Sequence, residues 1–448
     1  MRGNSLALAL LTAALPLAAC GSVSSFPDAA GGIDGATNDA SPDAVVAGVV
    51  KVTVIDPNGG APVVGAQVVF LQPDGSVASR VATDGVGKAQ GEVLPGGSVV
   101  SVLIGPNSYS MEQIRAVKPG DDLEMNYFQP YSDNTQLGTF GATWSAYSGA
   151  TQYGLFGPCG STNSNASNPL SATLTIYQNC KQNSMDLIAV AYDANFNPLA
   201  YLEKPNVPFS PNGATALGNG WQTMKTFNGN FTNLPADVTN VRLTHYAPDG
   251  RGWSIQGSAT PTGGTESIAV QTVTAATAVV RSEFNNASNS RQQVQAGIAG
   301  NSLNYSLDVG GALMKWIDIP TYTGDTGALA VTLSGSSTVV PDGAYVRLGY
   351  SRPAAFSAVP GVITNQYDWV ILGPEAGPLT LPTLPPEVGD VGPKLGDSVG
   401  FSPFVAILEA DSLDGYDDFR AGLGNLDALF GEHVTTGTAR FSTSPNLR

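Results

Sequence analysis

Residues 49–55 read Val-Val-Lys-Val-Thr-Val-Ile, and the stretch Asp56-Pro57-Asn58-Gly59-Gly60 follows directly. Apolar side chains alternate around Lys51 and Thr53, which is the period-two pattern of a β-strand with one buried face. Asp, Pro, Asn and Gly in succession favour a tight turn, because these residues readily adopt the backbone angles that turns require. The stretch therefore predicts a strand followed by a reversal of the chain, the unit of antiparallel β-structure.

The same alternation of strands and turns continues to residue 104. The signals are a second apolar run at Ala66–Leu71, a turn at Asp74-Gly75, the turn Leu94-Pro95-Gly96-Gly97 and a last run at Val99–Ile104. Short strands separated by Gly-rich turns every ~8–12 residues are typical of a β-sandwich. We therefore expect a small β-sandwich over residues 46–130.

The turn residues of this region carry a resemblance to a known family. They are Asp56, Pro62-Val63-Val64-Gly65-Ala66, Thr83-Asp84, Gly87-Lys88-Ala89 and Leu94-Pro95-Gly96-Gly97, with Val68 and Val99-Val100 in the strands between them. At these positions the chain resembles the carboxypeptidase regulatory-like domain, a small transthyretin-like β-sandwich. The resemblance implies an accessory module without catalytic residues. A generic immunoglobulin-like domain is the open alternative.

Composition extends the β interpretation to the whole chain of 448 residues. Only 12% of the residues are charged, whereas 53 are glycine and 31 are proline, which suits short strands joined by many turns. We expect an all-β protein of tandem antiparallel β-sandwich domains, immunoglobulin-like or transthyretin-like. Two further β-rich domains would occupy residues 131–260 and 261–448.

Two segments of the last region depart from the strand pattern. Residues 374–393 contain six prolines and predict an irregular crossing segment, because proline cannot donate a hydrogen bond to a sheet. A short helix is expected near Tyr416–Phe430. No long amphipathic helix is predicted.

The first twenty residues read as a signal peptide. Arg2 supplies a positive charge, Leu6–Pro16 supplies an apolar run too short to cross a bilayer, and Leu17-Ala18-Ala19-Cys20 ends it. These last four residues resemble the lipobox of bacterial lipoproteins, which implies cleavage before Cys20 and lipidation of its thiol. The alternative is an ordinary secreted protein with a cysteine after its signal.

Residues 21–45 predict a disordered acidic tether. Their Gly, Ser, Ala and Asp cannot bury enough apolar surface to offset the entropy of ordering. In Gram-negative lipoproteins an Asp after the lipidated cysteine often keeps the protein in the inner membrane, so Gly21 favours the outer membrane. The lipid on Cys20 would contact that membrane, and the body would face the periplasm or the cell exterior.

Charge and cysteine content restrict the partners. The formal net charge of −16 repels phosphate backbones, so nucleic acid is not an expected partner. With Cys20 taken by the anchor, Cys159 and Cys180 are left as a pair, which in an exported protein predicts a disulfide. No histidine lies near either cysteine, and neither a metal nor a cofactor is expected.

Few residues offer catalytic chemistry. Of the 2 histidines, His245 lies in an alternating strand, where a structural role is expected, and His433 lies near the end of the chain. The stretch Gly396-Asp397-Ser398-Val399-Gly400 has the Gly-x-Ser-x-Gly spelling of a nucleophile elbow, and Asp411 and His433 follow it in hydrolase order. Prolines on both sides argue against the strand-to-helix turn that such an elbow requires.

Two other groups could bind a ligand. One is the acidic cluster of Glu409, Asp411, Asp414, Asp417 and Asp418, which could hold calcium, although its spacing does not fit an EF-hand and a solvated turn is the default. The other is Trp221, which follows Gly220 and precedes polar residues, and is the tryptophan most expected to be exposed. Core packing is the usual fate of tryptophan.

These observations favour a membrane-anchored, extracytoplasmic lipoprotein that acts as a non-enzymatic interaction or adhesion protein of the cell envelope, with its protein or glycan partner unidentified. A glycan-binding surface module is the alternative, and it predicts a row of exposed Trp or Tyr on one sheet face. A hydrolase is less favoured. It would need a carboxylate pair, or Ser398 exposed beside His433 in a cleft of converging polar groups.

Overall fold

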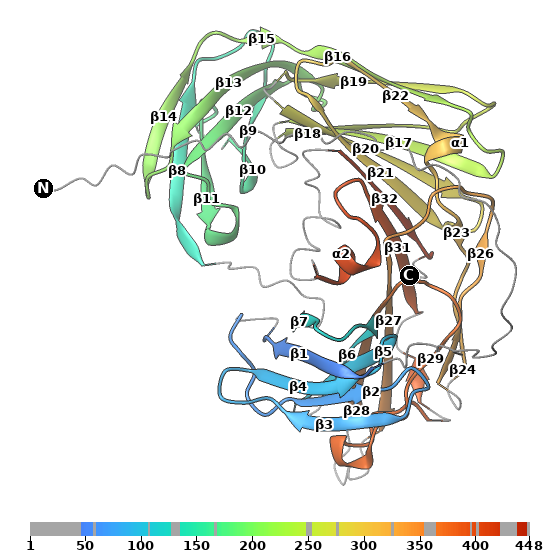
Figure 1. Cartoon of the computed structure of the whole chain (residues 1–448). Helices are drawn as coiled ribbons and strands as arrows, with labels where there is room; N and C mark the ends of the chain where they lie inside the picture. Colours follow the sequence, from blue (N-terminus) through green and yellow to red (C-terminus); the bar gives the residue numbers. More distant parts are fainter. Residues whose placement is uncertain are drawn as a thin grey trace, which may run out of the picture. The chain divides into compact units, whose positions relative to one another are not determined.

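In the computed structural model, one sheet of 13 strands joins the beginning, the middle and the end of the described chain (Figure 1). The structure describes residues 46–56, 60–105, 108–126, 135–164, 168–247, 253–274, 277–323, 327–353, 364–394, 397–399, 403–421 and 437–445. All of them belong to one compact unit, residues 45–448, and residues 1–44 form a separate unit outside the described ranges.

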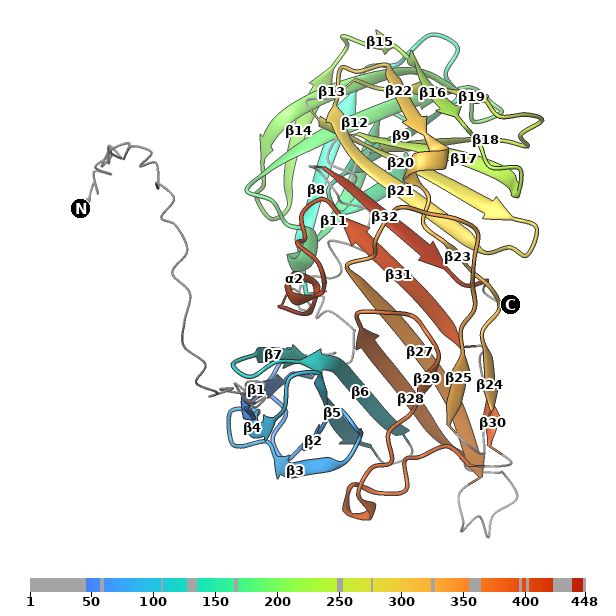
Figure 2. The same ribbon diagram turned by 45° about the vertical axis from the view of Figure 1, so that its right-hand side comes forward.

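The order of strands in this large sheet does not follow the order of the chain. From edge to edge it is β18 (Trp253–Ala259), β17 (Val238–Ala247), β20 (Thr277–Asn286), β21 (Arg291–Ala299), β32 (Thr438–Thr443), β31 (Phe404–Ala410), β27 (Gly343–Pro353), β28 (Thr364–Gly373), β6 (Ser108–Val117), β5 (Gly97–Ile104), β2 (Gln67–Leu71) and β3 (Val77–Ala82), with β30 (Ser398–Val399) attached to β27. Figure 2 shows β31, β27, β28 and β6 side by side.

Sheet pairing crosses the positions expected to separate three β regions. β28 runs parallel to β6 and pairs Tyr367 with Tyr109, so residues on both sides of position 130 share a ladder. β17 and β20 pair in antiparallel fashion across position 260. Whether the regions 46–130, 131–260 and 261–448 fold independently stays a prediction.

The first sandwich packs a small sheet against one face of the large sheet. The small sheet has the order β4 (Lys88–Val93), β1 (Gly48–Val54) and β7 (Asp122–Met125). β1 confirms the strand expected at residues 49–55. Val50, Val52 and Val54 are buried, whereas Val49 is 40% exposed. The alternating apolar residues of the sequence therefore indicate correctly which face of β1 is buried. The core of this sandwich also takes in Phe419 of α2 (Tyr416–Ala421).

The turn at residues 84–88 explains one part of the sequence pattern. Oδ1 of Asp84 accepts hydrogen bonds from the backbone N–H groups of Lys88 and Val86, each 2.9 Å long. These bonds hold the pKa of Asp84 below its ordinary value. Gly87 has a φ of +75°, and a Cβ there would lie 2.9 Å from the carbonyl oxygen of Val54. Glycine is therefore required at this turn on both grounds.

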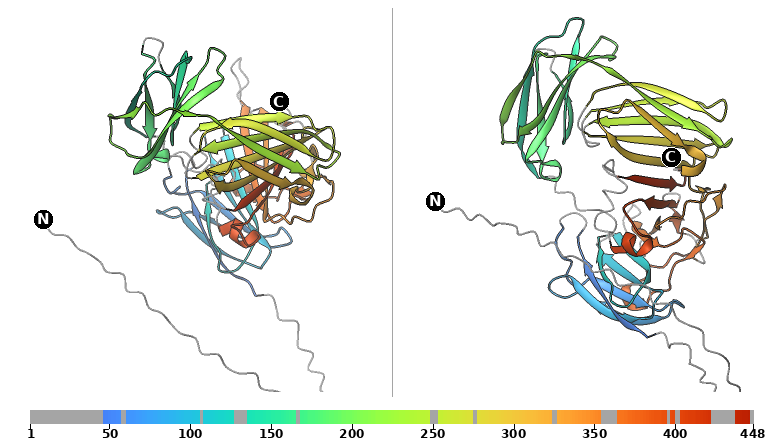
Figure 3. Two further views of the ribbon diagram at one scale, coloured as in Figure 1. Left: turned by 90° about the horizontal axis from the view of Figure 1, so that it is seen from above. Right: turned by 45° about the horizontal axis from the view of Figure 1, so that its top comes forward.

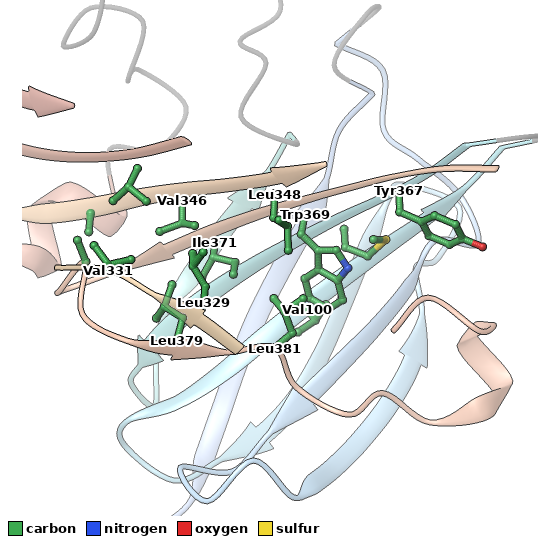
Figure 4. Close-up of a cluster of buried hydrophobic side chains, with 14 of the residues drawn as sticks. Val100, Leu329, Val331, Val346, Leu348, Tyr367, Trp369, Ile371, Leu379 and Leu381 are labelled. Atoms are coloured by element: carbon green, nitrogen blue, oxygen red, sulfur yellow. The ribbon is translucent and has the colours of Figure 1, made fainter. Parts of the chain in front are cut away.

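The opposite face of the large sheet is covered by short strands and by the proline-rich segment. These elements are β23 (Trp316–Ile317), β24 (Thr321–Thr323), β25 (Ala328–Ala330), β26 (Leu333–Ser334), β29 (Leu379–Thr380) and η2 (Pro386–Val388). Figure 4 shows Leu329, Leu379 and Leu381 of this cover against Trp369 and Ile371 of β28. Trp369 is fully buried, and its large side chain lies in the middle of this core.

A second sandwich packs on the other end of the large sheet. Its small sheet has the order β19 (Glu266–Thr272), β16 (Lys225–Thr232) and β22 (Asn304–Asp308), and the short helix α1 (Val309–Ala312) follows β22. The core between this sheet and β17, β20 and β21 includes Phe231 and Phe284, whose rings meet edge to face with centroids 5.8 Å apart.

A third sandwich is formed by residues 136–223, seen in green in Figure 3. One sheet has the order β10 (Gly160–Asn163), β9 (Gln152–Gly157), β12 (Ser184–Tyr192), β13 (Pro198–Pro208) and β15 (Gln222–Thr223). The other has the order β11 (Ser171–Tyr177), β8 (Gln136–Trp144) and β14 (Gly213–Gly218), and η1 (Gln178–Cys180) follows β11. Their facing side chains form one core.

The expected all-β class is confirmed, with one refinement. Most neighbouring strands are antiparallel, but β7, β14, β22 and β28 pair in parallel with β1, β8, β16 and β6, respectively. The helix expected near Tyr416–Phe430 is present as α2, and residues 422–430 lie outside the described ranges. Among the described residues, no helix has the length and apolar character needed to cross a membrane.

Trp369→Ala tests whether the shared sheet makes the body one cooperative unit. Truncating this buried side chain is expected to lower the free energy of unfolding by about 3–5 kcal/mol, because it removes apolar contacts and leaves a cavity. Hydrogen exchange followed by mass spectrometry should become faster in β5 and β6 as well as in β27. The matched control is Val340→Ala, which changes a side chain that is 78% exposed and should cost less than ~0.5 kcal/mol. Faster exchange confined to residues 261–448 would instead mean that the regions fold independently.

Candidate functional site

The proline-rich segment 374–394 crosses the large sheet without joining it. Most of it is irregular, as the six prolines of residues 374–393 predict. The exceptions are β29 (Leu379–Thr380), which pairs with β25, and the single turn of η2. The segment is nonetheless firmly packed, because Leu379, Val388 and Val391 are buried against the large sheet.

Arg352 at the end of β27 holds the far end of this segment. Its Nε and Nη2 donate to the two carboxylate oxygens of Asp397, each at 2.8 Å, and Nη2 also donates to the carbonyl oxygen of Gly392 at 2.6 Å. Burial alone would raise the pKa of Asp397. The hydrogen bonds from Arg352 and from the backbone N–H of Lys394 outweigh it and hold that pKa below its ordinary value. A two-pronged bond of this kind fixes orientation as well as distance.

A stack of three tyrosines lies beside this ion pair. Tyr109, Tyr367 and Tyr350 come from β6, β28 and β27, and neighbouring ring centroids are 4.7 Å apart. The guanidinium of Arg352 lies 4.9 Å from the centre of the Tyr367 ring. The hydroxyl of Tyr350 donates to the carbonyl oxygen of Val391 and accepts a 3.3 Å hydrogen bond from Nε1 of Trp369. Figure 4 shows Tyr367 beyond Trp369, at the end of the buried cluster.

Two clefts open on either side of residues 381–383, which line both. The loop cleft has a volume of about 520 Å³ and is lined by residues 327, 381–384, 386 and 389–394. Its two charged groups, Asp390 and Lys394, form an ion pair with each other. The second, here called the Arg115 cleft, has a volume of about 440 Å³. It lies between residues 71–75, 96–98, 113, 115 and 116 on one side and residues 374 and 380–383 on the other.

Ser398 does not lie in a nucleophile elbow. It belongs to β30, a strand of two residues that pairs with β27, and its side chain is exposed. The preceding carboxylate, Asp397, is bound to Arg352. Gly396, Gly400 and His433 lie outside the described residues. The described residues 397–399 therefore form a strand at Ser398, and not the strand-to-helix turn that presents a catalytic serine in hydrolases.

The acidic residues near α2 form ion pairs and hydrogen bonds with neighbouring groups of the fold. Glu409 pairs with Arg440, and Asp411 accepts a 2.9 Å hydrogen bond from the backbone N–H of Thr438. Asp417 pairs with Lys118 and Arg420. The backbone N–H of Asp414 donates to Asp418 at 3.0 Å. Within the described ranges no group of three or more His, Cys, Asp or Glu residues could hold a metal ion.

The tryptophans do not form an exposed row within the described chain. Trp144, Trp253, Trp316 and Trp369 are buried. Trp221, expected to be the most exposed, is half-buried. Its indole N–H donates to the carbonyl oxygen of Ser145 at 2.9 Å, and its ring lies 5.7 Å from those of Tyr147 and Tyr153. Trp221 therefore packs at the edge of the core of the third sandwich.

Cys159 and Cys180 form the expected disulfide, with their Cα atoms 5.2 Å apart. The bond joins the turn between β9 and β10 to η1, which follows β11, so it links the two sheets of the third sandwich. Cys20, the predicted site of lipidation, lies outside the described residues. The lipid anchor stays a prediction.

His245 has the structural role expected from its strand. Its side chain is fully buried in β17, and Nδ1 lies 2.8 Å from Oγ1 of Thr272. The ring packs against Phe227 with centroids 4.4 Å apart. Nε2 has no hydrogen-bond partner among the described residues. Burial lowers the pKa of His245 from 6.5 to about 4, so the ring is neutral at pH 7.

Sequence reasoning missed the tyrosine stack, the bond between Arg352 and Asp397, and the Arg115 cleft. Spacing within a strand does carry part of the signal, because Tyr367 and Trp369 share a face by alternation. The stack itself depends on the register that places Tyr350 and Tyr109 opposite Tyr367 on neighbouring strands. β6 and β28 are far apart along the chain, and a single sequence contains no signal for the register between them.

Comparisons with known proteins do not assign a family. No family model and no curated protein matches the chain. Among solved structures it is similar to the Bacillus anthracis TIE protein, with 12% identity and a TM-score of 0.15 over 58% of this chain and 50% of that one. A putative adhesin from Bacteroides ovatus has 10% identity and a TM-score of 0.16, over 41% of this chain and 94% of that one. BcpA, the major pilin subunit of Bacillus cereus, has 10% identity and a TM-score of 0.15, over 59% and 99%.

The chain thus spans half the length of the TIE protein. At these identities and TM-scores the similarities carry no argument about function.

The burial of His245 predicts an acid-sensitive body. In the unfolded chain the ring takes up a proton near pH 6.5, whereas in the folded protein it does so only near pH 4. The unfolded state therefore gains stability as the pH falls from about 6.5 to about 4, and the shift is worth about 3 kcal/mol. His245→Gln removes the titration and keeps a polar group near Thr272.

Urea unfolding at about pH 7 and about pH 4.5 measures this effect. Carboxylates titrate alike in both proteins, so the wild type should lose more stability than the variant by about 2–3 kcal/mol. An equal loss in the two proteins would show that His245 is not held neutral by the fold.

Proposed function

We propose that this chain is a non-enzymatic interaction protein of the cell envelope, held on the outer membrane by a lipid on Cys20. The resemblance of Leu17-Ala18-Ala19-Cys20 to a lipobox supports the anchor. The resemblance of residues 46–130 to the carboxypeptidase regulatory-like domain supports an accessory rather than a catalytic first module. The disulfide between Cys159 and Cys180 agrees with an oxidising, extracytoplasmic location.

The chemistry of the Arg115 cleft is the observation on which the binding role rests. Its described lining offers one arginine and the neutral polar side chains of Ser98, Gln113 and Thr383. Asp74, the carboxylate at its rim, accepts hydrogen bonds from the backbone N–H and the hydroxyl of Ser76. Such a cleft can recognise a ligand by charge and hydrogen bonds, and it presents no nucleophile paired with a base.

The groups that could have supported hydrolysis serve the fold instead. Asp397 is bound to Arg352, and three acidic residues near α2, Glu409, Asp411 and Asp417, pair with arginine or lysine side chains. A glycan-binding module built on a row of tryptophans is not favoured, because the tryptophans pack into cores. An interaction role is therefore favoured over both alternatives.

Cys20→Ala tests the anchor. The wild-type protein should incorporate an alkyne-labelled fatty acid. It is also expected in the membrane fraction, because each CH₂ of an acyl chain buried in a bilayer stabilises membrane binding by ~0.8 kcal/mol. The variant should be unlabelled and soluble. The matched control is the double variant Cys159→Ser and Cys180→Ser, which removes two other cysteines and should stay labelled and membrane-bound. A Cys20→Ala protein that remained in the membrane fraction would refute the anchor.

Protease treatment of intact cells then decides which way the body faces. Digestion of the wild-type protein on whole cells would place the body outside, where a surface partner should be sought. Protection until the outer membrane is opened would place it in the periplasm. Release of the anchored protein with the cytosolic fraction would contradict an extracytoplasmic role.

A further inference from the structure

Arg115 is distinguished by its lack of an ionic partner. Nearly all arginines in the described ranges pair with a carboxylate: Arg242, Arg281 and Arg291 with Glu283, Arg347 with Asp368, Arg352 with Asp397, Arg420 with Asp121, and Arg440 with Glu409. Arg80 has no such partner there and is exposed on the edge strand β3. Arg115 is half-buried, and its guanidinium has no ion pair or hydrogen bond within the described residues.

An unpaired, half-buried guanidinium is unusual in a chain with a net charge of −16. Removing a cation from water costs free energy that a carboxylate partner normally offsets. The ion pairs within the described ranges all use other cations, while Arg115 faces a cleft of about 440 Å³. A volume of this size is in the range of small-molecule sites.

We propose that the Arg115 cleft binds the carboxylate of a small polar molecule, of the size of a sugar acid or an amino acid, through the guanidinium of Arg115. This inference rests on the proposed interaction role and specifies the ligand chemistry of the same cleft. Arginine is suited to the task because its planar fork donates two parallel hydrogen bonds to a carboxylate.

A glycine lies next to the side chain of Arg115. A Cβ at Gly373 of β28 would lie 3.6 Å from Cδ and 3.7 Å from Nη1 of Arg115, which are ordinary contact distances. Alanine would therefore fit at this position, and a larger side chain would compete with the guanidinium for space. The glycine ends the strand, and Pro374 turns the chain away to form the opposite wall.

Neutral hydrogen-bonding groups lie along the strands beside Arg115. Gln113 and Ser98 stand on the same face as Arg115, with exposed fractions of 6% and 9%, and Nε2 of Gln113 donates to Oγ of Ser98 at 3.2 Å. The bond leaves the hydroxyl hydrogen of Ser98 for another acceptor. Hydroxyls or an amide next to the ligand's carboxylate would meet these groups and Thr383 across the cleft.

The rim favours a single negative charge. Asp74 lies in the lining, and its hydrogen bonds to Ser76 hold its pKa below the ordinary value, so it is ionised at pH 7. A carboxylate at the rim repels a multiply charged anion more than a singly charged one. Carboxylates are therefore preferred over phosphate in this cleft.

Calorimetric titration of the purified full-length protein tests the proposal. The carboxylate probes are D-glucuronate and N-acetyl-L-alanine, which separate a sugar acid from a peptide terminus. Each has a neutral counterpart, D-glucose and N-acetyl-L-alanine amide, and inorganic phosphate is the third anion. At least one carboxylate should bind, and its neutral counterpart and phosphate should bind at least tenfold more weakly.

Arg115→Gln is expected to weaken carboxylate binding about 10- to 100-fold, the loss typical of one charged hydrogen-bonding group. The matched control is Arg80→Gln, which removes the unpaired arginine of the same sheet outside the cleft and should leave binding unchanged. Arg115→Lys keeps the charge without the fork and should fall between the wild type and Arg115→Gln. Unfolding midpoints close to the wild-type value would show that these variants are folded.

Three outcomes would overturn the proposal: no binding of either carboxylate, equal binding of a carboxylate and its neutral counterpart, or equal losses in Arg115→Gln and Arg80→Gln. A fourth concerns Glu375, which is exposed and follows Pro374. Carboxylate binding seen only in Glu375→Gln would mean that the chain supplies its own partner to Arg115, and would overturn the proposal for the wild-type protein. Because these assays use purified protein, their failure leaves the Cys20 and protease results intact, and failure of the anchor leaves the cleft intact.

Discussion

The ladder between β28 and β6 is the constraint on which the rest of the body depends. Residues 366–372 pair in parallel with residues 108–114, and this is where the strands of the first sandwich join those of the later chain. Closing such a distant pairing is entropically costly. Burial on both faces offsets the cost, since Val370 and Leu372 enter one core while Trp369 and Ile371 enter the other.

The proline-rich segment acquires its position from the same ladder. The tyrosines stack where β6, β28 and β27 run together, and Tyr350 and Arg352 hold the carbonyl groups of Val391 and Gly392. Proline prevents the segment from adding a full strand, so it lies across the sheet with space on either side. The two clefts are thus a product of a chain that is fixed firmly at its end and paired with β25 at only two residues.

Local sequence patterns predicted much of the secondary structure. They did not predict the register between strands that are far apart along the chain. The alternation at residues 49–55 identified β1 and its buried face. Asp84 and Gly87 identified a turn, and the hydrogen bonds of Asp84 and the positive φ of Gly87 explain why these residues are found there. The disulfide followed from the cysteine count, with Cys20 assigned to the anchor, and from the expected export of the chain. By contrast, Arg352 and Asp397 are 45 residues apart, and nothing in either neighbourhood indicates the other. Arg115 likewise lies next to Gly373 because of a pairing that a single sequence does not encode in any local pattern.

The position of β31 and β32 has a consequence for biogenesis. These late strands lie between β21 and β27, so the large sheet has a gap in its middle until residues 438–443 arrive. Once β21 and β27 have been made, a growing chain would expose two unpaired strand edges until β31 and β32 are made, and unpaired edges are prone to wrong pairing. A protein with this strand order would avoid wrong pairing if it stayed unfolded until its last strands were available. Export as an extended chain through a membrane channel would impose that delay, so the topology would suit the secretory signal predicted at residues 1–20.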